Sequence, residues 1–235
     1  DAARRHADRN INASAWRGAR RAEKELGVEP RVAESQEESD YATNLRSFAK
    51  QGYDVVYAIG YLEQEAYNQV SKEYPNTKFL IIDGESAGTP NAAGVKFQEQ
   101  EGSFLAGALA AGMSKSGVLG FVGGMHGPVI SRFENGYKAG AKSMNPNIRV
   151  LSTYTESWED SGKGKEAALM QFSQGADVVF HAAGKCGLGV FAAVKDQPEG
   201  KWAIGVDSDQ DHLVEGRILT SMVKRVDNAV FETTK

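Results

Sequence analysis

The chain has 235 residues, of which 41% are apolar and 25% charged, and it carries a formal net charge of −4. This composition is typical of a globular protein, and the charge gives no reason to expect nucleic acid or an anionic membrane surface as a partner. The one cysteine, Cys186, excludes an internal disulfide and a multi-cysteine zinc site. The four histidines show no metal-ligand spacing, so we expect neither a metal nor a cofactor.

A helical pattern follows an arginine-rich stretch at the start of the chain. Asn12 suits a helix N-cap, and apolar residues recur at helical spacing until Gly27. The arginines between residues 4 and 21 are followed by Glu23 and Glu25, which favours a solvated helix face over a binding patch.

Apolar strands and helices then alternate along the chain. The patterns predict strands at 28–34, 54–59, 78–82, 94–97, 118–122, 149–152, 177–182, 202–206 and 219–223. They predict helices at 12–26, 40–52, 63–74, 99–115, 129–144, 163–174 and 190–195, with a further helix start at 227. This alternation predicts an α/β fold with doubly wound parallel sheets and right-handed crossovers.

Two stretches of the chain, residues 34–83 and 156–207, repeat one another. Each contains a glutamate, the aspartate of an Asp-Val-Val strand and an aspartate after the next strand, in this order: Glu34, Asp54 and Asp83, then Glu156, Asp177 and Asp207. The spacing from the glutamate to the strand is 20 and 21 residues, and from the strand to the last aspartate 29 and 30 residues. A repeat of this length predicts two similar domains rather than a solenoid of short repeats.

The repeat therefore predicts two Rossmann-like, doubly wound domains with a ligand cleft between them. We expect an N-terminal lobe of residues 1–115 plus 225–235 and a C-terminal lobe of residues 116–224. No low-complexity linker separates the halves, so the chain would cross between the lobes near Ser114 to Gly117 and return near Lys224 to Asp227.

Candidate binding residues follow from the rule that ligands of open α/β sheets lie beyond the carboxyl ends of the strands. The rule selects Tyr61, Asp83, Trp158, Gly184 and Asp207, each of which follows a predicted strand. Asp207 ranks first, because a carboxylate at a strand end can accept hydrogen bonds from two neighbouring hydroxyls of a ribose. The alternative for Asp207 is an Asx-turn or a helix cap.

Other candidates have a structural alternative of their own. Trp158 takes the place of Gln36 in the repeat, and it would stack on a flat ligand or pack in the core of its own domain. Tyr61 carries the same two interpretations. Lys224 follows the last strand and would pair with a polar ligand or stay solvated.

No catalytic motif has the surroundings that its chemistry requires. Gly84 to Gly88 has the spelling of a nucleophile elbow, but Thr89 and Pro90 prevent the helix that must follow at once. The glycine-rich loops lack a dinucleotide fingerprint, and Cys186 has no organised histidine and carboxylate pattern. We therefore expect a binding protein and not an enzyme.

Six phrases are spread over nearly the whole chain. They are residues 8–18 (DRNINASAWRG), 39–45 (SDYATNL), 102–107 (GSFLAG), 120–124 (GFVGG), 129–136 (VISRFENG) and 204–210 (IGVDSDQ). Together they resemble the basic membrane protein family, which comprises substrate-binding lipoproteins of ABC importers, and within it the purine nucleoside receptor A lipoproteins.

The resemblance implies a type I periplasmic-binding fold, in which two Rossmann-like domains joined by a multi-strand hinge close on a solute. It implies a purine nucleoside as ligand, with the base stacked on aromatic rings and met by the segment of Asp8 and Asn12, and with the ribose bound to Asp207 and Lys224. The expected partner is an ABC transporter permease. The expected protein is a monomer in the periplasm or on the cell surface, held by a lipid anchor outside this chain.

The chain departs from the family at several positions. Ile11 stands where the family usually has an aromatic residue, and Lys185 and Cys186 stand near the place of a second stacking aromatic. The resemblance also implies a strand before Asp1 and further elements after Lys235.

Other hypotheses stand beside the nucleoside receptor. The family includes riboflavin receptors, so the same fold would serve riboflavin or another small ligand. A cytoplasmic ligand-sensing domain of a gene regulator would share the fold and would need a DNA-binding segment elsewhere. An enzyme acting on a nucleoside or a sugar is the remaining hypothesis.

Overall fold

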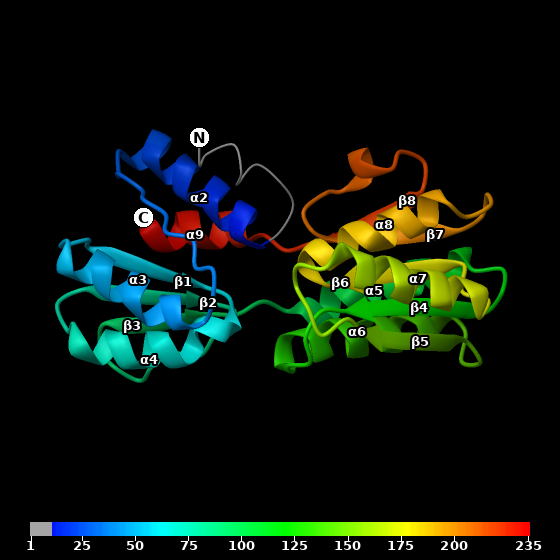
Figure 1. Cartoon of the computed structure of the whole chain (residues 1–235), viewed down its shortest axis with the longest axis horizontal. Helices are drawn as coiled ribbons and strands as arrows, with labels where there is room; N and C mark the ends of the chain where they lie inside the picture. The colour runs from blue at the N-terminus through cyan, green and yellow to red at the C-terminus, as the bar shows by residue number, and fades with distance from the viewer. Residues whose placement is uncertain (1–10) are drawn as a thin grey trace. The chain divides into compact units, whose positions relative to one another are not determined.

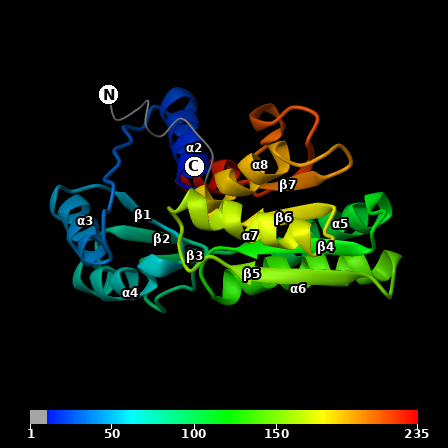
Figure 2. The same cartoon turned by 45° about the vertical axis from the view of Figure 1, so that its right-hand side comes forward.

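The computed structural model describes residues 11–235, which form two compact α/β units (Figure 1). Unit 1 contains residues 11–97 and 225–235, and unit 2 contains residues 98–224. In each unit, helices lie on both faces of a parallel sheet, as the alternation of strands and helices predicts (Figure 2).

Unit 1 is built on a parallel sheet with the strand order β1-β2-β3. Its elements are strands β1 (Val55–Ile59), β2 (Lys78–Ile82) and β3 (Ala92–Val95), helices α2 (Ile11–Leu26), α3 (Ser39–Lys50), α4 (Gln64–Glu73) and α9 (Val226–Thr234), and the 3₁₀ turn η1 (Tyr61–Glu63). Side chains alternate along β1: Val56 and Ala58 pack with α3 and α4, whereas Tyr57 and Ile59 pack with α2 and α9. The strand is therefore covered on both faces, as its apolar run predicts.

Unit 2 is built on a parallel sheet with the strand order β5-β4-β6-β7-β8. Its elements are strands β4 (Val118–Gly123), β5 (Arg149–Tyr154), β6 (Val178–Ala182), β7 (Trp202–Asp207) and β8 (Ile218–Val223), helices α5 (Glu99–Met113), α6 (Pro128–Met144), α7 (Ser161–Ser173) and α8 (Gly187–Lys195), and the 3₁₀ turns η2 (Gly184–Cys186) and η3 (Asp211–Leu213). Helices α7 and α8 pack on one face of the sheet, and aromatic rings of α6 pack on the other. Every residue of the middle strand β6 is buried.

The internal repeat is confirmed down to single backbone hydrogen bonds. In unit 1, Lys78 N donates to Asp54 O (3.1 Å), and in unit 2, Trp202 N donates to Asp177 O (2.8 Å). In both units the strand after this aspartate leads into a 3₁₀ turn and then a helix: η1 and α4 after β1, and η2 and α8 after β6. The two copies thus build the same chain path.

The division between the units differs from the expected one by a single helix. The expected boundary after residue 115 assigns α5 to the N-terminal lobe, whereas the structure divides the chain between Phe97 and Gln98. Helix α5 packs along α6, where Gly107 and Gly140 leave no room for a side chain against the backbone of the other helix. Helix α9 follows β8 of unit 2 but packs on α2 and belongs to unit 1. In the same way, α5 follows β3 of unit 1 but belongs to unit 2.

One predicted strand does not form in the part of the chain that the structure describes. Residues 27–35 have neither helix nor strand, although their pattern predicts a strand at 28–34. The corresponding strand of unit 2, β5, forms by pairing with β4. No strand among residues 11–97 pairs with this segment, and a strand needs a partner for its backbone groups.

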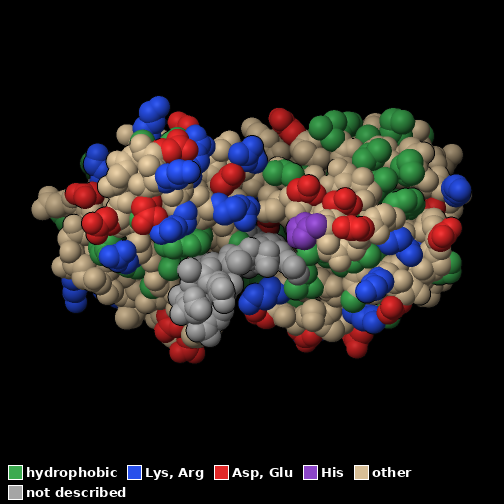
Figure 3. Space-filling view, turned by 90° about the horizontal axis from the view of Figure 1, so that it is seen from above, with side chains coloured by type: hydrophobic (Ala, Val, Ile, Leu, Met, Phe, Trp, Pro, Cys, Tyr) green, Lys and Arg blue, Asp and Glu red, His purple; other side chains and the backbone are tan. Residues whose placement is uncertain are grey.

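Basic and acidic side chains are mixed on the surface of helix α2. Arg20 pairs with Glu23, and Arg21 lies 2.9 Å from Glu25. Figure 3 shows Lys and Arg side chains among Asp and Glu side chains on the left-hand part of the view. The helix presents a mixed, solvated face rather than a basic patch, as its sequence predicts.

Candidate functional site

The strand ends of unit 2 bring the predicted residues of this unit to one edge of the sheet. Gly184 begins η2 after β6, Asp207 is the last residue of β7, and Lys224 directly follows β8. These strands run parallel and are neighbours in the sheet. The three residues therefore stand in a row along the carboxyl edge, where α/β sheets bind their ligands.

Trp158 packs against the neighbouring loops of unit 2. Its ring fills the space that a side chain at Gly124 would occupy, and a Cβ at Gly184 would lie 3.3 Å from its Cε3. Its carbonyl oxygen accepts a hydrogen bond from Lys185 N at 2.9 Å. Its Nε1 is buried, and none of the described residues accepts a hydrogen bond from it. Trp158 thus joins the loops that follow β4 and β6.

Asp207 and Asp83 have the same unusual backbone conformation. Both have a φ of 67°, a left-handed value that few residues other than glycine adopt. The backbone carbonyl of Asp207 accepts a hydrogen bond from Lys224 N at 3.0 Å, and Asp83 N donates to Val95 O at 2.8 Å. Aspartate tolerates this conformation better than most residues, and the conformation recurs at the matching strand ends of the two units.

The Lys224 side chain is buried beside a carboxylate that no sequence pattern singled out. Its Nζ lies 3.0 Å from Glu99 Oε1 and 5.7 Å from the centre of the Phe133 ring. Arg132 Nε donates to the other carboxylate oxygen, Glu99 Oε2, at 2.7 Å. The side chains of Lys224 and Glu99 are 2% and 0% exposed. The solvated alternative for Lys224 is therefore wrong.

Glu99 remains charged in spite of its burial. Burial raises the pKa of its carboxyl group, but the hydrogen bond from Arg132 and the charge of Lys224 outweigh burial and hold the pKa below its ordinary value. Removal of one partner of such a buried ion pair leaves the other charge buried and uncompensated, which is strongly destabilising. One local signal was available, since Glu99 is the first residue of α5 and the helix dipole stabilises a carboxylate there.

In unit 1, Tyr61 is the predicted site residue at a strand end. It begins η1 after β1, as Gly184 begins η2 after β6 in unit 2. The repeat thus places an aromatic ring at the strand end of one unit and a glycine at that of the other. Asn12 lies on the exposed surface of α2. Asp8, the other residue predicted to meet the base, lies outside the described residues.

The carboxyl group of Glu63 is a titratable group beside the end of β1. Glu63, the last residue of η1, accepts a hydrogen bond from Ile59 N at 3.2 Å. Burial raises the pKa of Glu63 to about 7, and the hydrogen bond from Ile59 offsets part of the rise. The carboxyl group therefore titrates near neutral pH, which its sequence neighbourhood did not indicate.

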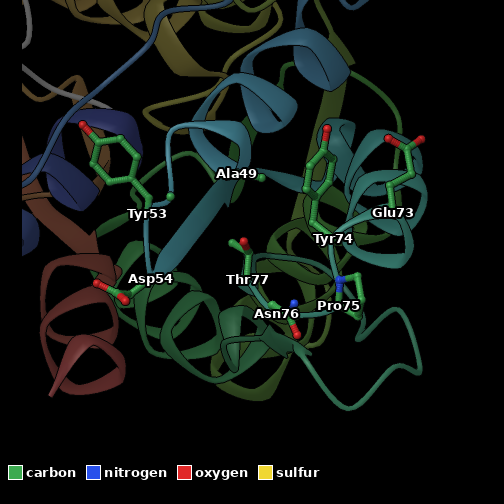
Figure 4. Close-up of a pocket in the computed structure, with 9 residues that line it drawn as sticks. Ala49, Tyr53, Asp54, Glu73, Tyr74, Pro75, Asn76 and Thr77 are labelled. Carbon is green, nitrogen blue, oxygen red and sulfur yellow. The ribbon is translucent and has the colours of Figure 1, made fainter.

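Two surface hollows are lined by other residues than the predicted ones. One of about 410 Å³ lies at the amino ends of β1 and β2 in unit 1, next to the ends of α3 and α4 (Figure 4). The other, of about 320 Å³, lies at the carboxyl end of β5 in unit 2, next to α7. Neither is lined by a predicted site residue, so the candidate site is defined by the strand ends.

Three further observations concern the nucleophile-elbow spelling, metal binding and membrane crossing. The segment from Gly84 to Gly88 is followed by β3 rather than by a helix, so it does not form a nucleophile elbow. Among the described residues, no group of three or more His, Cys, Asp or Glu side chains could hold a metal ion. Within the same residues, every helix is too short or too polar to cross a membrane.

Comparison with known proteins decides the family. A sequence profile described as "ABC transporter substrate-binding protein PnrA-like" matches residues 4–235. This chain belongs to that family. The predicted resemblance to the basic membrane protein family is thereby confirmed.

Basic membrane protein A1 of Borrelia garinii subsp. bavariensis is 36% identical to this PnrA-like chain, over 93% of the chain and 66% of its own length. The ABC transporter nucleoside-binding protein BmpA of Lactococcus lactis subsp. cremoris is 36% identical over 95% of the chain and 69% of its own length. The crystal structure of an ABC transporter solute-binding protein from Aeropyrum pernix K1 matches with a TM-score of 0.88 and 32% identity, over 95% of this chain and 65% of that chain. The chain thus spans about two thirds of the length of these relatives.

The fold prediction is confirmed by these matches and by the parallel sheets of both units. The chain is α/β and has the type I periplasmic-binding fold of ABC transporter solute-binding proteins. Its family is one of substrate-binding proteins.

Proposed function

We propose that this PnrA-like chain binds a purine nucleoside and presents it to the permease of an ABC importer. The observation that carries the proposal is the pairing of Asp207 and Lys224 on neighbouring strand ends, joined by a backbone hydrogen bond of 3.0 Å. A carboxylate and an ammonium group can together satisfy the vicinal hydroxyls of a ribose, which both donate and accept hydrogen bonds. The printed name of the Lactococcus relative, a nucleoside-binding protein, supports this choice of ligand.

We assign the polar contacts to unit 2 and an aromatic contact to unit 1. In unit 2, Glu99 orients the ammonium group of Lys224 at the strand end, and Trp158 holds the loop of Gly184. In unit 1, Tyr61 offers a ring on which the base can stack. This assignment compensates for Ile11, which stands where the family usually has an aromatic.

The remaining parts of the proposal follow from family membership. A substrate-binding protein of an importer works outside the cytoplasm, so we propose a periplasmic or cell-surface protein held by a lipid anchor outside this chain. We further propose that it acts as a monomer and releases its nucleoside unchanged. The match of residues 4–235 to a family of ABC transporter substrate-binding proteins supports the location outside the cytoplasm and the release of an unchanged ligand.

The experiment begins with mass spectrometry of what co-purifies with the protein. Protein freed of this solute is then titrated with adenosine, guanosine, inosine and riboflavin while its thermal unfolding is followed. At a concentration of about 100 times Kd, the correct ligand should stabilise the chain by about 2.7 kcal/mol. Chromatography of the nucleoside after incubation should show no product.

The possible outcomes separate the hypotheses. Stabilisation by riboflavin alone would favour the flavin alternative. The absence of stabilisation by every nucleoside would contradict the purine proposal. A nucleoside that is cleaved during incubation would show that the chain is an enzyme.

A further inference from the structure

The hollow at the amino ends of β1 and β2 has no part in the proposed nucleoside site. It has a volume of about 410 Å³ and is lined by residues 49, 52–54 and 73–77. Figure 4 shows Ala49 and Thr77 between Tyr53 on one side and Tyr74 on the other. Because both central side chains are short, the space between the tyrosines is open.

The matching place in unit 2 is filled by two long side chains. Lys201 Nζ lies 6.0 Å from the centre of the Phe172 ring. The same nitrogen donates a hydrogen bond to Ala176 O at 2.6 Å. The lysine is therefore held by a ring and by a backbone carbonyl of its own unit.

Backbone hydrogen bonds show that Ala49 corresponds to Phe172. At the end of α3, Gly52 N donates to Ala49 O at 3.1 Å. At the end of α7, Gly175 N donates to Phe172 O at 3.0 Å. Both glycines have a left-handed φ, 81° and 100°, which ends the helix in the same manner.

Side chains that bridge matching carbonyl groups show that Thr77 corresponds to Lys201. The bridging donors are Asn91 in unit 1 and Arg217 in unit 2. The acceptors of Asn91, at 2.9 to 3.1 Å, are the carbonyl oxygens of Ser71, Tyr74 and Thr77. The acceptors of Arg217, at 2.6 to 3.1 Å, include the carbonyl oxygens of Val194, Gln197 and Lys201. The same backbone frame thus surrounds the hollow in unit 1 and the lysine in unit 2.

We propose that the hollow of unit 1 binds a lysine side chain of a protein partner. Unit 2 shows the occupant that this frame accepts, because Lys201 there places its ammonium group on the carbonyl oxygen of Ala176. In unit 1 the corresponding carbonyl belongs to Tyr53, and Thr77 is too short to reach it. The incoming lysine takes the place that the chain fills for itself in unit 2.

The charge of the lining favours a cation. Asp54 and Glu73 line the hollow, and no lysine, arginine or histidine is among its lining residues. Glu73 pairs with Arg46 at 2.6 Å. Asp54 takes part in none of the ion pairs found among the described residues, so its charge can act on a partner. An ammonium group at this open site keeps much of its hydration, so its desolvation cost is small.

A titration of the nitrogen-15-labelled chain tests the proposal. The probe is Nα-acetyl-lysine N-methylamide, and the control is the norleucine analogue, which has the same kind of apolar stem without the ammonium group. We expect saturable shifts of the amide resonances of Gly52, Tyr53 and Thr77 with the lysine probe only. Asp54→Asn should weaken this response several-fold, whereas Glu65→Gln, in the exposed first turn of α4, should leave it unchanged.

Filling the hollow provides a second measurement. The double variant Ala49→Phe with Thr77→Lys supplies the pair that unit 2 contains, and it should abolish the response to the probe and raise the Tm. Conversely, Lys201→Thr should open the place in unit 2 and add a response at Gly175.

Two results would overturn the proposal. The first is an equal response to both probes, or no response to either, in the unaltered chain. The second is tighter binding of 1,5-diaminopentane than of the lysine probe, which would assign the hollow to a free diamine rather than to a protein partner.

Discussion

At the carboxyl edge of its sheet, unit 1 has Tyr61 where unit 2 has Gly184, although both residues begin a 3₁₀ turn after the matching strand. Both units also have an aspartate with a φ of 67° at a strand end: Asp83 directly follows β2, and Asp207 is the last residue of β7. The backbone frame is therefore shared, while the side chains at its ends differ. The comparison teaches that the two copies share a hydrogen-bonded backbone and differ in the side chains that stand at the strand ends.

The amino edges of the two sheets lead to the same conclusion. Phe172 and Lys201 fill unit 2 at the place where Ala49 and Thr77 leave the hollow of unit 1. Backbone hydrogen bonds match across the two places, so the difference lies in side-chain volume and charge alone. At these two positions unit 2 thus has an aromatic ring and an ammonium group, and unit 1 has neither.

The largest expected effect comes from the charge cluster that distinguishes unit 2. Glu99→Gln would leave Lys224 buried without a full counter-charge, and the free energy of unfolding should fall by about 3–5 kcal/mol. Urea unfolding measures this loss. Glu101→Gln, an exposed change in the same turn of α5, should alter stability by less than about 0.5 kcal/mol.

The double variant Glu99→Gln with Lys224→Met completes this comparison. It removes both charges, so it should recover most of the loss. If Glu99→Gln alone is as stable as the unaltered chain, the pair contributes nothing to the fold.

The next effect compares the two strand-end aspartates. Asparagine tolerates a left-handed φ, so Asp207→Asn and Asp83→Asn should both fold. Asp207→Asn should lose most of the stabilisation of about 2.7 kcal/mol that a nucleoside gives at about 100 times Kd, because its carboxylate is the proposed ribose acceptor. Asp83→Asn should keep it. Thermal unfolding with and without the co-purified nucleoside measures both.

A larger loss of ligand stabilisation in Asp83→Asn than in Asp207→Asn would contradict the assignment of the ribose to unit 2. Unchanged binding by Asp207→Asn would remove the proposed ribose site from unit 2. Equal losses in both variants would show that the two edges contribute alike.

A smaller effect is expected where Trp158 joins the loops of unit 2. Gly124→Ala would drive a Cβ into the Trp158 ring and should cost about 1–3 kcal/mol in the free energy of unfolding. Gly112→Ala is the matched control, since a Cβ there meets nothing within 4 Å. In a helix this exchange should instead stabilise by about 0.5–1 kcal/mol. Trp158→Leu added to Gly124→Ala should restore part of the loss, and a failure to do so would show that the ring is not the obstacle.

The last effect depends on pH and concerns Glu63, which ends η1 at the place that Cys186 takes in η2. Burial raises the pKa of Glu63 from 4.5 to about 7, so the folded chain favours the protonated carboxyl group. Its contribution to stability is fully present below the unfolded pKa and is lost as the pH rises through the folded pKa. Between pH 4.5 and about 7, the urea midpoint of the unaltered chain should therefore fall relative to that of Glu63→Gln. Glu65→Gln should follow the unaltered chain, and identical pH profiles for all three would exclude the effect.

Much of the frame could be predicted from local patterns. The apolar runs of β1 and β6 indicate strands that are covered on both faces, and the structure buries them so. The strand-end rule selected Gly184 and Asp207, and Lys224 follows the last predicted strand. The structure places these three residues in a row along one edge of the sheet. These predictions succeed because hydrophobic periodicity and strand direction are properties of short segments.

Other features were out of reach of such patterns. The segment 28–34 has the composition of a strand, but composition does not supply the neighbour that a strand needs. Trp158 was open to two interpretations, and its contacts with Gly124 and Gly184 come from loops that are far apart in the sequence. The role of Glu99 depends on Lys224, near the other end of the chain.

By itself, the sequence determined that this chain is α/β, that it is duplicated, and that its polar candidates follow the strands. Only the tertiary structure decided that α5 joins unit 2 and that Glu99 neutralises Lys224. The physical reason is the same in both cases. Helices pack closely through glycines, and buried charges pair, only where segments that are distant in the sequence come into contact. The periodicity of a short segment does not show which distant segment it will contact.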